Sequence, residues 1–235
     1  MQNIETSSIQ YQNQEIKFQI IRSQRKTLEI AVLPNQEIQV SAPIHASVAI
    51  LNEKVKNRML WIKEQQAYFK QFETKQPYTQ KQYMGGETHL FLGKSYLLKL
   101  LNHPQKKISL KRKILEVSNP SLDPSSIRTQ ILQWHRQQAQ LIFEQILMEK
   151  SKQFQIQNLP KIQIRQMKTR WGSLSKKGIM TLNLKLIHVP KDCIEYVITH
   201  ELCHQNHPKH NQAFYQLLSE RMKNWAELKL KLEKF

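Results

Sequence analysis

The sequence predicts an α+β fold with a β-rich N-terminal half and a more helical C-terminal half. In the first half, short segments alternate polar and apolar residues, as half-buried strands do. In the second half, apolar residues recur every three or four positions, which is typical of amphipathic helices. The 40% apolar content of these 235 residues allows a real core and excludes a disordered chain. We predict two domains, over residues 1–122 and 123–235.

The predicted N-terminal domain contains several strands and one long helix. Its helix extends from about residue 48 to 72, where the apolar period changes from two to that of a helix. Residues 106–117 form a further strand-like segment rich in lysine, which suits either phosphate contact or the protection of an exposed sheet edge. The remaining strands are expected over residues 15–20, 27–32, 37–40, 89–92 and 95–101.

The predicted C-terminal domain opens with a helix whose start is marked by Asp123 and Pro124. Asp is a common N-cap residue, and proline is favoured at the first helical position, so the helix is expected from here to about residue 152. Strands are expected over residues 161–167 and 180–184. Helices should follow Pro190 and Pro208, and the chain ends in an amphipathic segment.

The chain is strongly basic. Its 36 Lys and Arg residues outnumber 18 Asp and Glu residues, which gives a formal charge of +18. Such an excess attracts polyanions, so nucleic acid and nucleotides are candidate partners, and a generally basic, well-solvated surface is the alternative explanation. No segment approaches the roughly 18 apolar residues needed to span a bilayer.

The expected location is the cytoplasm. The first residues lack the apolar run of a secretory signal. The two cysteines, Cys193 and Cys203, lie ten residues apart in one predicted helix. At 1.5 Å per residue their Cα atoms would be ~15 Å apart, too far for a disulfide, which fits a reducing compartment.

The string His200-Glu201-Leu202-Cys203-His204 has the H-E-x-x-H pattern. Residues four apart project from the same face of a helix, so His200 and His204 can share one tetrahedral metal ion. Glu201 lies one position away and reaches a metal-activated water as general base. The pattern therefore predicts a zinc-dependent hydrolase with one zinc per chain.

A third metal ligand is needed, and three residues are candidates for the role, of which His207, placed by the turn, is the weakest. His210 lies six residues after His204, the separation used where a chain leaves the motif helix and turns back to the metal. Pro208 should end the helix near Asn206 or His207, because proline disfavours helical geometry in the preceding residue. Glu220 is the alternative ligand, from the next helix. We favour His210.

The chain resembles the YgjP-like metal-dependent hydrolases, a family related to SprT-like and other zincin metallopeptidases. Its motifs are present from residue 22 to residue 214, so the resemblance covers most of the chain. They comprise Arg22 to Leu28, Gly86 to Gly93, Arg170-Trp171-Gly172-Ser173, Thr181-Leu182-Asn183, the H-E-x-x-H string and His210 to Phe214.

This resemblance implies a zincin-like catalytic domain over residues 123–235. It also implies zinc on His200, His204 and His210, with Glu201 catalytic. The Arg170–Ser173 segment should lie near the cleft, without a role assigned to each residue. One departure is visible, because Leu174 stands where the family commonly has a cysteine. An essential thiol at that position is therefore not expected.

Three functions remain to be separated. The leading hypothesis is a metallopeptidase acting on peptides or proteins, with proteins bound to nucleic acid as one candidate substrate. Arg170 and Tyr215 are candidates to stabilise the oxyanion. The alternative is a nucleotide phosphoanhydride hydrolase (pyrophosphatase), which the lysine surplus suits although the chain has no glycine-rich phosphate loop. The third is a non-enzymatic basic module that binds nucleic acid and holds a structural zinc.

Overall fold

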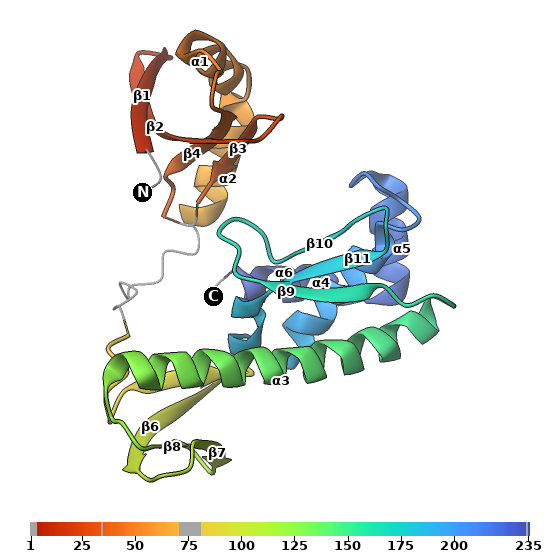
Figure 1. Ribbon diagram of the computed structural model, residues 1–235. Helices are drawn as coiled ribbons and strands as arrows, with labels where there is room; N and C mark the ends of the chain where they lie inside the picture. The colour runs from red at the N-terminus through yellow and green to blue at the C-terminus, as the bar shows by residue number, and fades with distance from the viewer. Residues whose placement is uncertain (1–3, 34, 71–80, 234) are drawn as a thin grey trace. The chain divides into compact units, whose positions relative to one another are not determined.

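The computed structural model describes residues 4–33, 35–70, 81–233 and 235 (Figure 1). The chain divides into two compact units, residues 1–75 and 76–235, and each is described by itself. None of the helices in the described ranges combines the length and apolar character that a bilayer crossing requires.

The first unit is a four-stranded sheet covered by two helices. The strand order is β1-β2-β4-β3, with β2 and β4 parallel and the other pairs antiparallel. Phe18, Ile20 and Val40 of the sheet pack against Leu51 and Val55 of the first helix. The elements are β1 (Ile4–Tyr11), β2 (Gln14–Ser23), β3 (Glu29–Val32), β4 (Ile38–Pro43), α1 (Val48–Asn57) and α2 (Met59–Lys70).

Two features of this unit differ from the prediction. The single helix expected over residues 48–72 is two helices that break at Arg58, where the Arg58 N–H bonds to the Val55 carbonyl at 3.0 Å. Residues 71 and 72 lie outside the described residues. Strand β1 was not predicted, because its sequence IETSSIQY does not alternate; its pairing with β2 over its whole length makes it a strand.

The second unit begins with another four-stranded sheet, of order β5-β6-β8-β7. The segment 106–117 was expected to be a single strand, and it is the hairpin β7–β8 instead. Arg112 has a φ of 54° at the turn, a local reversal that the lysine-rich sequence did not indicate. The strands are β5 (Thr88–Phe91), β6 (Lys94–Asn102), β7 (Lys107–Lys111) and β8 (Ile114–Asn119).

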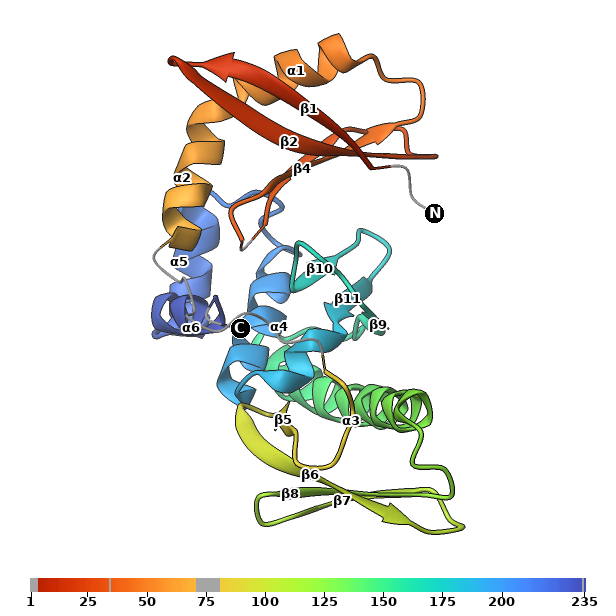
Figure 2. The ribbon, with the colours of Figure 1, turned by 90° about the vertical axis from the view of Figure 1, so that its left-hand side faces the viewer.

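A 30-residue helix, α3 (Pro124–Gln153), connects the parts of this unit (Figures 1 and 2). It begins as predicted, since the Asp123 carboxylate accepts from the N–H groups of Ser125 and Ser126. Its first turns pack on the β5–β8 sheet through Ile127 and Ile131. The predicted boundary after residue 122 therefore falls inside the second compact unit, and a functional division there stays a prediction.

The rest of the unit is a three-stranded sheet followed by helices, as the predicted α+β fold requires. The sheet order is β10-β11-β9, so β10 lies at an edge, antiparallel to β11. The sheet and the long helix enclose α4 in the main core of the unit. The elements are β9 (Lys161–Arg165), β10 (Gly172–Leu174), β11 (Ile179–Asn183), η1 (Leu184–His188), α4 (Lys191–Cys203), α5 (Gln212–Arg221) and α6 (Trp225–Leu232).

Candidate active site

Helix α4 presents the H-E-x-x-H string to a cavity because its other side is apolar. Ile194, Ile198 and Leu202 are fully buried in the core. Spacings of four residues keep them on one side of the helix. His200 and His204 are only partly buried and lie on the wall of the cavity.

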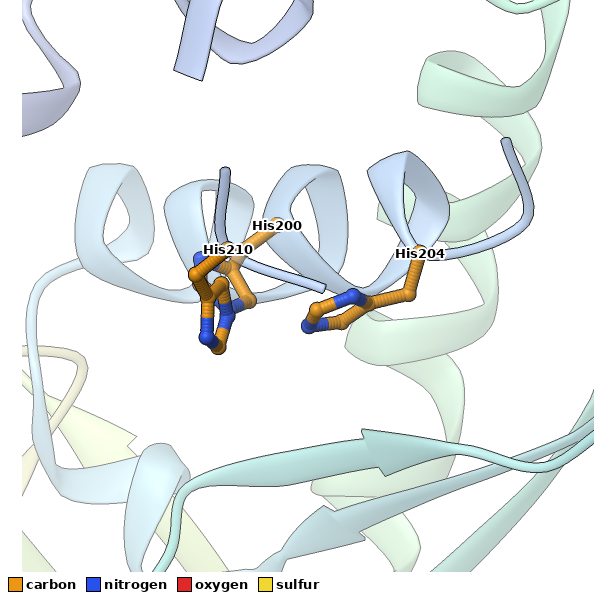
Figure 3. A group of neighbouring side chains, drawn as sticks. All are labelled: His200, His204 and His210. Carbon is orange, nitrogen blue, oxygen red and sulfur yellow. The ribbon is translucent and has the colours of Figure 1, made fainter. Parts of the chain in front are cut away.

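The chain turns sharply after α4. The α-helix ends at Cys203, three or four residues earlier than the proline at 208 indicated. Main-chain bonds nevertheless continue the turn, from the Asn206 and His207 N–H groups to the Cys203 carbonyl at 3.2 and 3.0 Å. This turn reverses the chain and brings His210 back beside the helix (Figure 3).

The three histidines converge. One ring nitrogen from each of His200, His204 and His210 lies within 4.8 Å of the others. The Nε2 atoms of His200 and His210 are 2.9 Å apart. The Nδ1 atom of His204 lies 3.0 Å from the His207 carbonyl oxygen, which can only accept, so Nδ1 donates this hydrogen bond and Nε2 is the nitrogen left to bind a metal.

This donor set fits a metal ion such as zinc. Burial, and then the neighbouring imidazoles His210 and His204, lower the pKa of His200 to about 3. Burial and His204 also lower the pKa of His210. Both rings are therefore neutral near pH 7, and neutral imidazole is the form that coordinates zinc.

The competing residues lie elsewhere. Glu220 is exposed on α5, where its carboxylate accepts from Gln216 at 3.3 Å. Within the described residues, no other group of three histidine, cysteine or acidic side chains converges as these histidines do. The structure thus brings His210, and not Glu220 or the His207 ring, to the two histidines of α4.

Glu201 lies beside the histidines in an unusual environment for a carboxylate. Its side chain is only 6% exposed. Burial raises the pKa of Glu201 to about 7, although a hydrogen bond from the Leu174 main chain and the charge of Arg170 act in the opposite direction. A carboxylate with a pKa near neutrality can both accept and return a proton at physiological pH.

The cavity at the site has a volume of about 910 Å³. Strand β10, α4, the turn after it and α6 form its walls. Arg170, Lys176 and Lys229 give the walls a basic character. Arg170, one of the two residues expected to stabilise an oxyanion, is thus at the cavity, whereas the ring of the other, Tyr215, stacks on His210 at 6.2 Å between centroids.

Sequence reasoning missed part of this site. Strand β10 has only three residues, too few for an alternating pattern to be visible. Lys229 belongs to the terminal amphipathic segment, and no local signal placed it near the histidines. The one available signal was the string Arg170–Ser173, which was expected near the cleft and does line it.

Comparisons with known proteins give the family. The family model described as "YgjP-like, metallopeptidase domain" matches residues 26–235. Two solved structures are similar, both of metallopeptidase zymogens: abylysin of Pyrococcus abyssi and jannalysin of Methanocaldococcus jannaschii. Abylysin is 21% identical with a TM-score of 0.36, covering 38% of this chain and 90% of its own. Jannalysin is 25% identical with a TM-score of 0.35, covering 38% and 92%.

No curated protein matches the chain. The family model, however, covers every residue from 26 to the end. The chain therefore belongs to the YgjP-like metallopeptidase family and is a metal-dependent hydrolase.

Proposed function

We propose that this protein hydrolyses peptide bonds, with one zinc ion held by His200, His204 and His210 and with Glu201 as general base. The observation that carries the proposal is the convergence of three imidazoles beside a buried carboxylate at an open cavity. The donor set resembles a catalytic zinc site, which takes three protein ligands and leaves one position open. A structural zinc would not account for the buried Glu201.

Glu201 performs the proton transfers in this proposal. When bound, zinc supplies Lewis-acid chemistry, polarising the scissile carbonyl and lowering the pKa of a water molecule. The Glu201 carboxylate accepts a proton from the attacking water and returns it to the nitrogen of the leaving amine. Arg170, whose positive charge acts on Glu201 at the cavity wall, is our candidate for stabilising the negative charge on the carbonyl oxygen.

The edge strand β10 supports a peptide substrate. The Trp171 carbonyl and the Ser175 N–H both bond to β11, each at 2.9 Å. Since main-chain groups alternate along an antiparallel strand, those of Gly172 and Leu174 point away from β11. The hydrogen bond from Leu174 to Glu201 shows that this side faces α4. An extended peptide bound along this edge would lie beside Glu201.

The test is metal content and peptide hydrolysis on purified variants. We expect about one zinc per wild-type chain, loss of zinc in His204→Ala, and full zinc with at least about 100-fold lower kcat in Glu201→Gln. Glu220→Gln is the matched control, since Glu220 was the alternative ligand, and it should keep both zinc and activity. Wild-type protein that binds no zinc on reconstitution would end the proposal.

A second candidate, nucleotide phosphoanhydride hydrolysis, is favoured by the three cationic residues on the cavity walls, Arg170, Lys176 and Lys229. Phosphate released from a panel of nucleoside triphosphates, measured beside the peptide panel, separates the two reactions. Cleavage of nucleotides with no cleavage of peptides would replace the peptidase proposal, because the same histidines and Glu201 can serve either reaction.

Proteins bound to nucleic acid are a further candidate class of substrate. Residues 76–235 carry most of the net charge of +18, and positive charge attracts the phosphates of nucleic acid. Binding of single-stranded DNA should weaken steeply between about 50 and 200 mM salt. Binding that is absent, or unaffected by salt, would remove nucleic acid from the proposal and leave the peptidase itself intact.

A further inference from the structure

Gly172 lies where strand β10 comes closest to helix α4. A Cβ atom at this position would lie 2.9 Å from Oε1 and 3.0 Å from Cγ of Glu201, and 3.1 Å from Cγ1 of Val197. Carbon atoms do not approach a carboxylate oxygen that closely without displacement. A side chain at 172 would therefore force Glu201 or the backbone of β10 to shift.

This steric constraint is distinct from the usual conformational role of glycine. Gly86, Gly93 and Gly178 have positive φ angles, which side chains disfavour. Gly172 is not among the positive-φ residues, so its backbone conformation accepts alanine. What an alanine meets there is the carboxylate of Glu201.

Glu201 has little room to retreat from an added methyl group. Its side chain is 6% exposed, and the main chain of Leu174, two residues along the same strand, donates a hydrogen bond to it. The main-chain groups of Gly172 and Leu174 both point away from β11. Residues two apart in a strand also have their Cβ positions on the same face of the sheet. The strand thus holds the carboxylate through one close approach and one hydrogen bond.

We propose that Gly172 is a positioning residue for Glu201, its missing side chain letting the carboxylate lie against β10 within reach of the Leu174 N–H. The inference rests on the proposed function, in which Glu201 is the general base. It assigns a role to the glycine of the Arg170–Ser173 string. A side chain at 172 displaces the base while leaving the three histidines where they are.

The first experiment is Gly172→Ala, assayed on the same peptide substrate. We expect kcat to fall about 10- to 100-fold, since a misplacement of about 1 Å costs a comparable factor. KM should stay within about threefold and zinc content unchanged, because neither depends on the position of the base. Gly85→Ala is the matched control: a Cβ there meets nothing within 4 Å and its φ is not positive, so its kcat should be that of the wild type.

Val197 provides the contrast with a purely structural role. If Gly172 serves only to pack β10 on α4, Val197→Ala makes room for the new methyl group and restores kcat to the level of Val197→Ala alone. If Gly172 acts through Glu201, the loss persists in the double variant, because the contact with the carboxylate remains. Loss of zinc in Gly172→Ala would contradict the proposal, whereas a loss of stability alone leaves the kcat of the double variant as the deciding measurement.

The outcomes separate this inference from the proposed function. A kcat within about twofold of the wild type in Gly172→Ala, or full rescue by Val197→Ala, overturns the role of Gly172 and leaves Glu201 as the base. Wild-type kcat in Glu201→Gln overturns the proposed function instead, whatever Gly172→Ala does. A persistent kcat loss with zinc retained supports the role of Gly172.

Discussion

The second unit contains two clusters of three histidines, and they differ in what they can bind. The site histidines are His200, His204 and His210; the core histidines are His89, His135 and His188. Ring centroids are 4.9 Å apart both for His200–His210 and for His135–His188. In each cluster, burial and neighbouring imidazoles lower pKa values, to about 3 for His200 and His135 alike.

The two clusters differ in where their ring nitrogens point and in whether those nitrogens face a cavity. The site histidines come from one helix and the turn that follows it, and their nitrogens converge at a cavity. The core histidines come from β5, α3 and η1. His135 is 4% exposed and packs against the rings of Phe91 and Trp134. Its Nε2 has no hydrogen-bond partner among the described residues. Proximity of histidines is therefore not enough for a metal site; their lone pairs must meet at one accessible point.

The largest expected difference is in metal content and activity. His200→Ala should lose zinc and at least about 1000-fold in kcat, because in the proposed function it removes a ligand and with it the Lewis acid. His135→Phe, which keeps an aromatic ring beside Phe91, should keep its zinc and stay within about threefold of wild-type kcat. Elemental analysis and peptide assays on both variants check this, and zinc loss in His135→Phe would contradict the division into two clusters.

The second prediction concerns stabilisation by the metal. Adding zinc to metal-free protein at 100 times its Kd should raise the free energy of unfolding by about 2.7 kcal/mol, because the folded state alone holds the convergent histidines. Melting temperatures with and without zinc measure the shift. We expect it in His135→Phe and not in His200→Ala. An equal shift in both variants would mean that zinc binds elsewhere.

The third prediction is a loss of stability in acid that depends on the core histidines. Burial, followed by the charges of His188 and His89, holds the pKa of His135 at about 3 in the folded protein. Unfolded histidine has a pKa near 6.5, so between about pH 6.5 and 3 the unfolded state binds a proton that the folded state does not. Stability therefore falls as the pH falls, by up to about 1.4 kcal/mol per pH unit for this group.

The pH effect is measured as a difference between variants. Urea unfolding of metal-free protein at pH 7.5 and 5 should show a smaller acid loss for His135→Phe than for the wild type. Burial, followed by the charges of His89, Lys185 and Lys81, lowers the pKa of His188 to about 4. His188 therefore also lowers stability in acid, and it does so in both proteins. The exposed His103, changed to Gln, is the control and should leave the loss unchanged. Equal losses in wild type and His135→Phe would refute the assignment.

The smallest expected effect concerns the link between the two clusters. Lys150 of α3, the helix that carries His135, lies 2.7 Å from Glu195 of α4, the helix that carries His200. Lys150→Met should lower the free energy of unfolding by about 1 kcal/mol or less, because the pair is only partly buried. Zinc content should not change. A change in zinc content would show that the packing of α3 on α4 sets the position of the site histidines.

Local sequence determined a large part of the fold. Asp123 and Pro124 correctly predicted the start of α3, since a cap and a fixed proline φ act within a few residues. The H-E-x-x-H string placed His200 and His204 on one face of a helix by the geometry of the helix alone. Strands β1 and β10 were not predicted, because their pairing with β2 and β11 defines them more than their own sequence pattern does. The break at Arg58 and the β7–β8 turn at Arg112 were not predicted either, because neither place has a glycine or proline to mark it.

The sequence by itself thus determined the α+β class, the main helices and the chemistry of the donor residues. Only the tertiary structure decided that His210 and not Glu220 meets the two histidines of α4, and that Glu201 lies buried against Gly172. The first result depends on how the turn after α4 closes, and the second on β10, a segment distant from α4 in the sequence. A carboxylate acquires a raised pKa only when other parts of the fold exclude water from it, and no spacing within α4 specifies that exclusion.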